Sequence, residues 1–176
     1  MMLFLYSNLS SKKIVSDLEE TLTHLKVKTF KIRYTDTKGH QSKGTLIWDK
    51  THPSQFIFEI RMPHQTTAIL NQNKRIVMRV QNNIDDTVSV KDITDNPLSS
   101  IFKKEVKFVE HSDSHVSATG RNIGKGYYQV ILHRFNDPEH KKDRIIVEYT
   151  KVKEHIKLVR WQTIMDNKGT EIEFFY

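Results

Sequence analysis

The chain has 176 residues, which suits one domain with a substantial core, and its 28 Lys and Arg exceed 21 Asp and Glu to give a formal net charge of +7. The absence of cysteine excludes disulfides, thiolate nucleophiles and thiolate metal sites. The positive charge favours acidic partners, and no apolar run approaches the roughly 20 residues needed to span a bilayer. Residues 1–12 begin with an apolar stretch that lacks a basic leader, so we interpret them as either the remnant of an export signal or a flexible N-terminus.

Two short helices are predicted, one near the start of the chain and one in its middle. Ser16 and Glu19 have the spacing of a capping box, and leucines at helical spacing follow over residues 18–25, so a helix of two to three turns is expected to begin at Ser16. At residues 95–102, Asn96 suits a cap and Pro97 suits the first helical position. This second helix is too short to be stable alone, so its apolar face must dock on another element.

The rest of the chain is predicted to be strands. Apolar side chains recur at every second residue over 30–34, 44–48 and 56–60, and residues 36–39 form a turn between the first two of these strands. Further strands are expected at 67–71, 75–80, 87–91, 106–110, 115–119, 127–134, 144–151, 156–164 and 170–175, with a glycine-rich turn at 120–126. These antiparallel strands and the two helices predict one mainly β (α+β) domain over residues 1–176.

The sequence carries no clear catalytic or metal-binding motif. His111 and His115 have close spacing, but they lie in a predicted turn and strand, and no third ligand is indicated. The glycines of residues 120–126 have the wrong spacing for a phosphate loop and precede a strand rather than a helix. No nucleophile elbow and no zinc-protease motif is present. We therefore expect no enzyme activity, no metal and no cofactor.

One face of the predicted sheet is strongly apolar, and two short helices supply too few side chains to cover it. This predicts an incomplete antiparallel β-barrel closed by short helices that act as a lid. Its interior is either a cavity that takes acyl chains or a fully packed core, and counting residues does not decide between them. The predicted lining residues are Phe30, Ile32, Tyr34, Leu46, Trp48, Phe56, Phe58, Ile60 and Met78, and the predicted lid residues are Leu98, Ile101 and Phe102.

An RNA-binding surface is the other interpretation of these strands. Phe30, Arg33 and Tyr34 alternate aromatic rings with a cation, as stacking platforms do. No RNP1 motif is present, however, and the aromatic residues are in phase with aliphatic ones. A core or an apolar cavity is therefore favoured over nucleic-acid binding.

The order of these motifs resembles the periplasmic outer-membrane lipoprotein carrier family, LolA. That family has a helix, a Gly-bearing hairpin and then Gly-x-Leu followed by Pro-x-x-Phe, represented here by Gly44, Leu46, Pro53 and Phe56. Strands at 67–78, a Pro-Leu lid helix at 96–102 and an Asp-x-x-Gly turn at 166–169 continue the resemblance. It spans approximately residues 14–176.

The resemblance implies a monomeric, non-catalytic periplasmic carrier. Such a protein accepts acylated lipoproteins from an inner-membrane ABC transporter for lipoprotein release and passes them to an outer-membrane lipoprotein receptor. The family commonly has an Arg before the Pro that bonds to the lid; His52 occupies this position here and is the predicted lid latch. The alternative is a lipid- or protein-sensing interaction domain on the same fold, with an RNA-binding β protein ranked lower.

Overall fold

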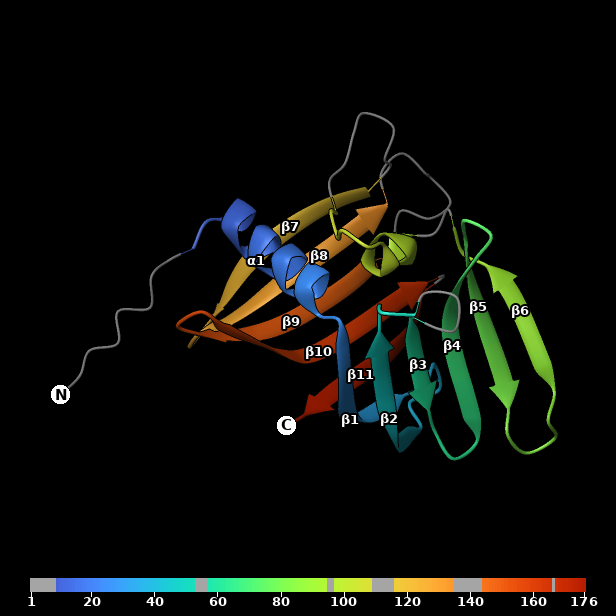
Figure 1. Ribbon diagram of the computed structural model, residues 1–176. Helices are drawn as coiled ribbons and strands as arrows, with labels where there is room; N and C mark the ends of the chain where they lie inside the picture. The colour runs from blue at the N-terminus through green and yellow to red at the C-terminus, as the bar shows by residue number, and fades with distance from the viewer. Residues whose placement is uncertain (1–8, 53–56, 95–96, 109–115, 135–143, 166) are drawn as a thin grey trace.

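A single curved sheet dominates the computed structural model, which describes residues 9–52, 57–94, 97–108, 116–134, 144–165 and 167–176 (Figure 1). These residues form one antiparallel sheet of eleven strands in the order β6-β5-β4-β3-β2-β1-β11-β10-β9-β8-β7. The strands are β1 Val27–Thr35, β2 Gln41–Asp49, β3 Phe58–Arg61, β4 Gln65–Gln72, β5 Arg75–Asn82, β6 Val88–Asp92, β7 Val116–Gly124, β8 Tyr127–Arg134, β9 Arg144–Val152, β10 His155–Met165 and β11 Lys168–Phe175. The helices are α1 Ser11–His24 and the 3₁₀ helix η1 Pro97–Phe102.

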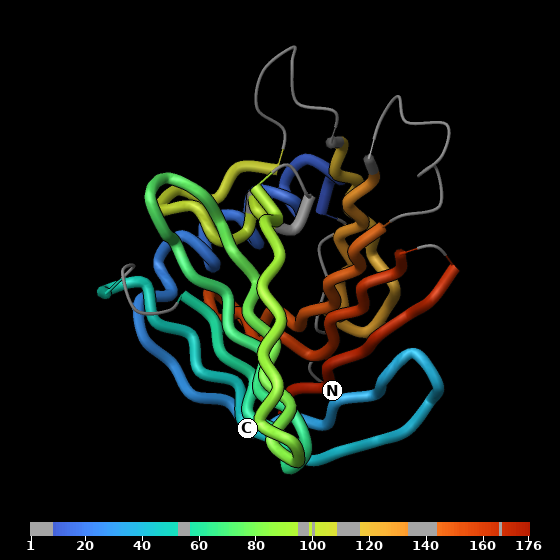
Figure 2. The backbone as a smooth tube through the Cα atoms, turned by 90° about the vertical axis from the view of Figure 1, so that its right-hand side faces the viewer, coloured from blue at the N-terminus to red at the C-terminus, as the bar shows by residue number. Residues whose placement is uncertain are grey.

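The mainly β class is confirmed, and the open sheet is consistent with an incomplete barrel. In Figure 2 the sheet curls, with β4–β6 (green) and β8–β11 (orange to red) on its two sides. Strands β6 and β7 are the two edges and have no pairing with each other in the described part of the chain. The structure differs from the expected pair of helices, because the described residues contain one α-helix and a 3₁₀ helix of six residues. No helix in the described residues is long and apolar enough to cross a membrane.

Helix α1 begins one and a half turns earlier than the capping box predicts. Ser10 is the N-cap, and its hydroxyl accepts a hydrogen bond from the Lys13 amide at 3.2 Å. Ser16 lies inside the helix, where its hydroxyl donates to the Lys13 carbonyl at 3.1 Å. The prediction was wrong because Ile14 and Val15 are buried and extend the apolar face of the helix toward the N-terminus.

The first hairpin forms as the alternation predicts. Strand β1 pairs with β2 from Val27 opposite Asp49 to Thr35 opposite Gln41. At the turn the Asp36 carboxylate accepts the Lys38 and His40 amides at 2.8 and 2.9 Å, which holds the turn closed.

The glycine-rich segment 120–126 is only partly a turn. Strand β7 continues through Gly124, and the reversal is centred on Lys125, which has a φ of 53°. Gly120 lies within the strand, beneath α1, where a Cβ would be 2.5 Å from the Ser11 carbonyl oxygen. Its amide also donates to the Ser11 hydroxyl at 2.8 Å. Glycine at position 120 therefore permits close packing of α1 on the sheet rather than a turn.

The predicted strand at 106–110 is wrong within the described residues. Residues 106–108 have no strand pairing and run beside α1 instead. The Val106 amide donates to the Thr23 hydroxyl at 2.9 Å, and the Phe108 amide donates to the Glu19 carboxylate at 2.7 Å. Val106 and Phe108 are buried, so their spacing reflects burial beneath the helix. Side-chain hydrogen bonds from α1 replace a sheet partner here.

Helix α1 packs across β7 and β8 and anchors to β9 through two buried contacts. The Tyr149 hydroxyl donates to the Ile14 carbonyl at 2.9 Å. Asp17 is 4% exposed and pairs with Lys13 and Lys151, each at 2.7 Å. Burial raises the pKa of Asp17, but the hydrogen bonds from both lysines outweigh this effect and lower it. The helix is thus held firmly on one half of the concave face of the sheet.

Candidate ligand-binding groove

Four of the nine predicted cavity residues and one predicted lid residue lie in a packed core. Phe30, Ile32, Leu46, Trp48 and Ile101 are each no more than 3% exposed and belong to one hydrophobic cluster that includes Leu18 and Leu22 of α1. The indole Nε1 of Trp48 donates to the Leu25 carbonyl at 2.7 Å, at the end of α1. Trp48 is therefore covered by the end of α1 and by Phe102 of η1, whereas the Phe30 ring packs against Phe174 and Tyr176.

Five other predicted residues line a groove on the concave face with a volume of about 340 Å³. These are Tyr34, Phe58, Ile60, Met78 and Phe102. The remaining lining residues are Gln65, Thr67, Ile69, Val80, Lys91, Ile93, Trp161, Thr163, Met165, Thr170 and Ile172. Phe56 lies outside the described residues, and so does the side chain of Leu98.

The groove brings together two parts of the chain that are distant in sequence. Strands β3–β6 supply one side, and β10 and β11 supply the other. The pairing of Tyr34 with Ile172 across β1 and β11 joins the two sides. Sequence reasoning missed Trp161 and Ile172, although both alternate within predicted strands, because no local signal indicates that β11 pairs with β1.

An aromatic cluster closes one end of the groove. The Phe58 ring lies 5.4 Å from Phe102 of η1 and 6.4 Å from Trp161 of β10, between ring centroids. Trp48 continues the cluster into the core, 5.9 Å from Phe58. Phe102 contacts the groove and Trp48 at once, so η1 is the boundary between the open groove and the packed core.

Most of the polar side chains that line the groove are uncharged. The Gln65 side chain donates to the Thr67 hydroxyl at 3.1 Å. Burial raises the pKa of Tyr34, against a hydrogen bond with Thr170, so the phenol stays neutral at physiological pH. Lys91 is the one cation among the lining residues, and it is exposed. This lining suits an apolar ligand with a polar or anionic end near Lys91.

The described residues contain no cluster of acidic, histidine or cysteine side chains that could hold a metal. His111 and His115 lie outside the described part of the chain. The residues that line the groove include no Asp, Glu, His or Cys, so the groove can bind a ligand through apolar contacts but holds no metal ligands of these types.

Lys50, rather than His52, connects the elements that cover the core. Its ammonium donates to the Leu22 carbonyl of α1 and to the Lys103 carbonyl just after η1, each at 3.0 Å. It also lies 5.1 Å from the centre of the Trp48 ring. Burial lowers the pKa of Lys50 to about 8. His52 is exposed, and its amide bonds to the Asp49 carboxylate.

Comparison with known proteins finds no family model and no curated protein that matches this chain.

Proposed function

We propose that this chain is a carrier that binds the acyl chains of lipoproteins in the groove of its concave face and shuttles them through the periplasm from the inner to the outer membrane. The observation that supports this proposal is an open groove with an apolar lining, next to the short 3₁₀ helix η1, whose Phe102 packs on the buried Trp48. Each methylene group that leaves water contributes about 0.8 kcal/mol, so an acyl chain crosses water only when it is covered. The carrier is non-catalytic and uses no cofactor.

The volume of the groove limits what it holds when η1 is in place. At about 340 Å³ it is at the small end of ligand pockets, which span roughly 300–1,000 Å³, so it takes one alkyl chain rather than three. A triacylated lipoprotein requires η1 to move away from the sheet. Movement of Phe102 uncovers Trp48, which is one of the residues that the sequence assigns to the cavity. In this proposal η1 is the lid and Lys50 is its latch.

The proposed route includes two further partners. An inner-membrane ABC transporter for lipoprotein release loads the carrier, and an outer-membrane lipoprotein receptor unloads it. The protein acts as a monomer between them, and nucleic acid is not a partner.

An interaction domain on the same fold is the second candidate, and edge strand β6 favours it. Val88 and Val90 of this strand are 46% and 65% exposed, and all five residues of the strand are exposed. An exposed edge can accept an extended peptide as an additional strand. A chain with this function keeps its groove empty and binds protein through β6.

The test is native mass spectrometry, with organic extraction, of protein purified after export in a host that has membranes. The carrier is expected to retain acyl lipid that the fluorescent hydrophobe bis-ANS displaces. Lipid-free protein that also fails to bind bis-ANS overturns the proposal and favours the interaction domain.

Two substitutions on one strand separate groove binding from general surface binding. Thr67 lines the groove and Thr66, its neighbour on β4, faces the other side of the sheet. Thr67→Trp fills the groove and is expected to weaken bis-ANS binding about tenfold or more, equivalent to roughly two buried methylene groups. Thr66→Trp is expected to bind as the unsubstituted protein does, and equal losses in both variants contradict the assignment of the groove.

A further inference from the structure

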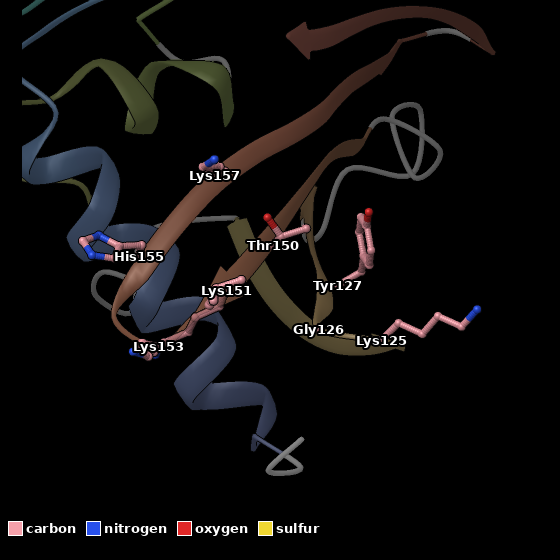
Figure 3. Close-up of a pocket in the computed structure, with 9 residues that line it drawn as sticks. Lys125, Gly126, Tyr127, Thr150, Lys151, Lys153, His155 and Lys157 are labelled. Carbon is pink, nitrogen blue, oxygen red and sulfur yellow. The ribbon is translucent and has the colours of Figure 1, made fainter. Parts of the chain in front are cut away.

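A second hollow, with basic residues, lies where two hairpins end side by side (Figure 3). It joins the β7–β8 turn to the β9–β10 turn and has a volume of about 650 Å³. The Lys151 amide donates to the Gly126 carbonyl at 3.2 Å, which fixes the two turns against each other. We call this surface the basic hairpin face; its residues are Lys125, Gly126, Tyr127, Thr150, Lys151, Val152, Lys153, His155 and Lys157.

Most of the basic hairpin face (Tyr127, Thr150, Val152, His155 and Lys157) is on the side of the sheet that α1 does not cover, whereas Lys151 points to the opposite side, toward α1. Tyr128 is buried and stacks on Tyr149, whose hydroxyl bonds to α1. Neighbouring strand residues point to opposite faces, so Tyr127 and Thr150 point away from the helix. The surface is therefore separate from the concave groove and from the proposed lid.

Three lysines give this face its charge. Lys125, Lys153 and Lys157 are exposed and make no ion pair within the described residues. Lys151 does not contribute, because it points toward α1 and pairs with Asp17 at 2.7 Å. Lys157 extends the basic region, since its ammonium lies 5.3 Å from the Tyr176 ring, which Lys28 approaches at 5.1 Å. Glu154 is the acidic residue in the β9–β10 turn.

Apolar side chains are exposed among these lysines. Tyr127 is 42% exposed and Val152 is 69% exposed, and Ile123, just before the β7–β8 turn, is 47% exposed. Exposed apolar side chains that gather in one place commonly mark an interaction surface. Apolar and tyrosine side chains beside lysines are the combination that enters the headgroup region of a membrane.

The directions of the lysines distinguish a broad partner from a small one. In Figure 3 the Lys125 side chain extends away from the hollow, on the far side of Tyr127 from His155 and Lys153. A small anion needs its cations to converge on it, and these diverge. A flat anionic surface is contacted by lysines that spread apart. Single-stranded nucleic acid fits less well, because its bases stack on successive aromatic rings, and Tyr127 is the single Tyr, Phe or Trp among the residues that line this face.

We propose that the basic hairpin face docks the protein on an anionic phospholipid bilayer. The lysines approach the lipid phosphates, while Tyr127 and Val152 enter the headgroup region. This inference stands apart from the proposed carrier function, because docking requires no acyl chain in the groove. For a carrier, it would hold the protein at the membrane where cargo is exchanged.

The test is sedimentation of the full chain with vesicles of phosphatidylglycerol and phosphatidylcholine, compared with phosphatidylcholine alone. Binding to the anionic vesicles alone is expected, weakening as salt rises. The triple variant Lys125→Asn, Lys153→Asn and Lys157→Gln is expected to lose roughly 100-fold in affinity, since each lysine near an anionic membrane is worth approximately a factor of five. Asn suits positions 125 and 153 because both have positive φ.

The matched control removes the same charge from the other end of the strands, with Lys38→Gln, Lys43→Gln and Lys168→Gln, which are all exposed. It is expected to lose no more than about fivefold. Equal losses in both triple variants show a general effect of net charge and overturn the proposal. Absence of vesicle binding at low salt, or tighter binding of a single-stranded RNA that the first variant abolishes, also overturns it. Neither result bears on bis-ANS binding in the groove, so the two proposals fail separately.

Discussion

The replacement of Lys50 by methionine tests whether a partly buried ammonium latches the lid. Methionine keeps an unbranched apolar stem beside Trp48 and removes the two hydrogen bonds to the Leu22 and Lys103 carbonyls. Each bond from a charged donor contributes approximately 1.5–3 kcal/mol, offset by the cost of burying the charge. At pH 6.5 these effects nearly cancel, and the variant is expected to lie within about 1 kcal/mol of the unsubstituted protein.

The sign of the pH dependence follows from the lowered pKa. Lys50 has a pKa of about 8 in the folded protein and 10.5 as the ordinary value, so between these values the unfolded chain binds more protons. The free energy of unfolding therefore rises with pH over this window and is lowest, for this group, below pH 8. The full shift corresponds to roughly 3.4 kcal/mol, and solvent screening of a partly exposed side chain reduces it to about 1–2 kcal/mol.

The assay is urea denaturation followed by tryptophan fluorescence at pH 6.5 and pH 9.5. The stability difference between the unsubstituted protein and Lys50→Met is expected to grow with pH. It should be about 1–2 kcal/mol larger at pH 9.5 than at pH 6.5, with the variant the less stable protein. Lys43→Met, at an exposed position of β2, is the control and is expected to show no such change. A stability difference that is the same at both pH values refutes the assignment of a buried, titrating latch.

Three further predictions concern packing and charge. Gly120→Ala places a Cβ 2.5 Å from the Ser11 carbonyl and is expected to cost about 1–3 kcal/mol in urea denaturation, whereas Gly169→Ala, with nearest atoms at 3.8 Å, serves as its control. Asp17→Asn leaves Lys151 without its carboxylate and is expected to cost roughly 3 kcal/mol of stability at pH 7. Because the pKa of Asp17 is lowered in the folded protein, this stability difference should shrink as pH falls below about 4. A difference that stays constant with pH would argue against the ion pair. Trp48→Asp, at 1% exposure, is expected to prevent folding, and a folded variant that has only lost bis-ANS binding would instead place Trp48 in an open cavity.

Alternation of apolar and polar residues in the sequence predicts most strands, and the buried side chains of β1 and β2 are the apolar ones of that pattern. Phe30 and Ile32 on β1, like Leu46 and Trp48 on β2, point to the concave face as predicted. Alternation does not predict how deeply a side chain is buried, because it identifies the face of the sheet but not the elements that cover that face. Trp48 is in the core because Leu25 and η1 lie over it, and these contacts join residues distant in sequence.

The ends of elements were predicted less well than their existence, for similar reasons. Position 120 indicated a turn because glycine permits both tight turns and close packing, and only the contact with Ser11 shows which applies. The latch role of His52, implied by the resemblance, stays a prediction, while Lys50, two residues earlier, makes the hydrogen bonds between α1 and the segment after η1. No sequence pattern distinguishes a lysine in water from one directed at a helix end. That distinction depends on how α1 crosses the sheet.

The two covers of the concave face differ in how firmly they are held, and this difference decides which can open. Helix α1 is fixed by the buried Asp17–Lys151 pair, by the Tyr149 hydroxyl and by close packing at Gly120. Helix η1 is a 3₁₀ helix of only six residues, and its hold on α1 includes the shared donor Lys50. Opening at η1 returns the Lys50 ammonium to water, so part of the cost of uncovering Trp48 is offset by solvation of that charge. In the proposed carrier, we therefore expect opening at η1, while α1 stays in place, to be the lower-energy route from a groove for one chain to a larger apolar cavity.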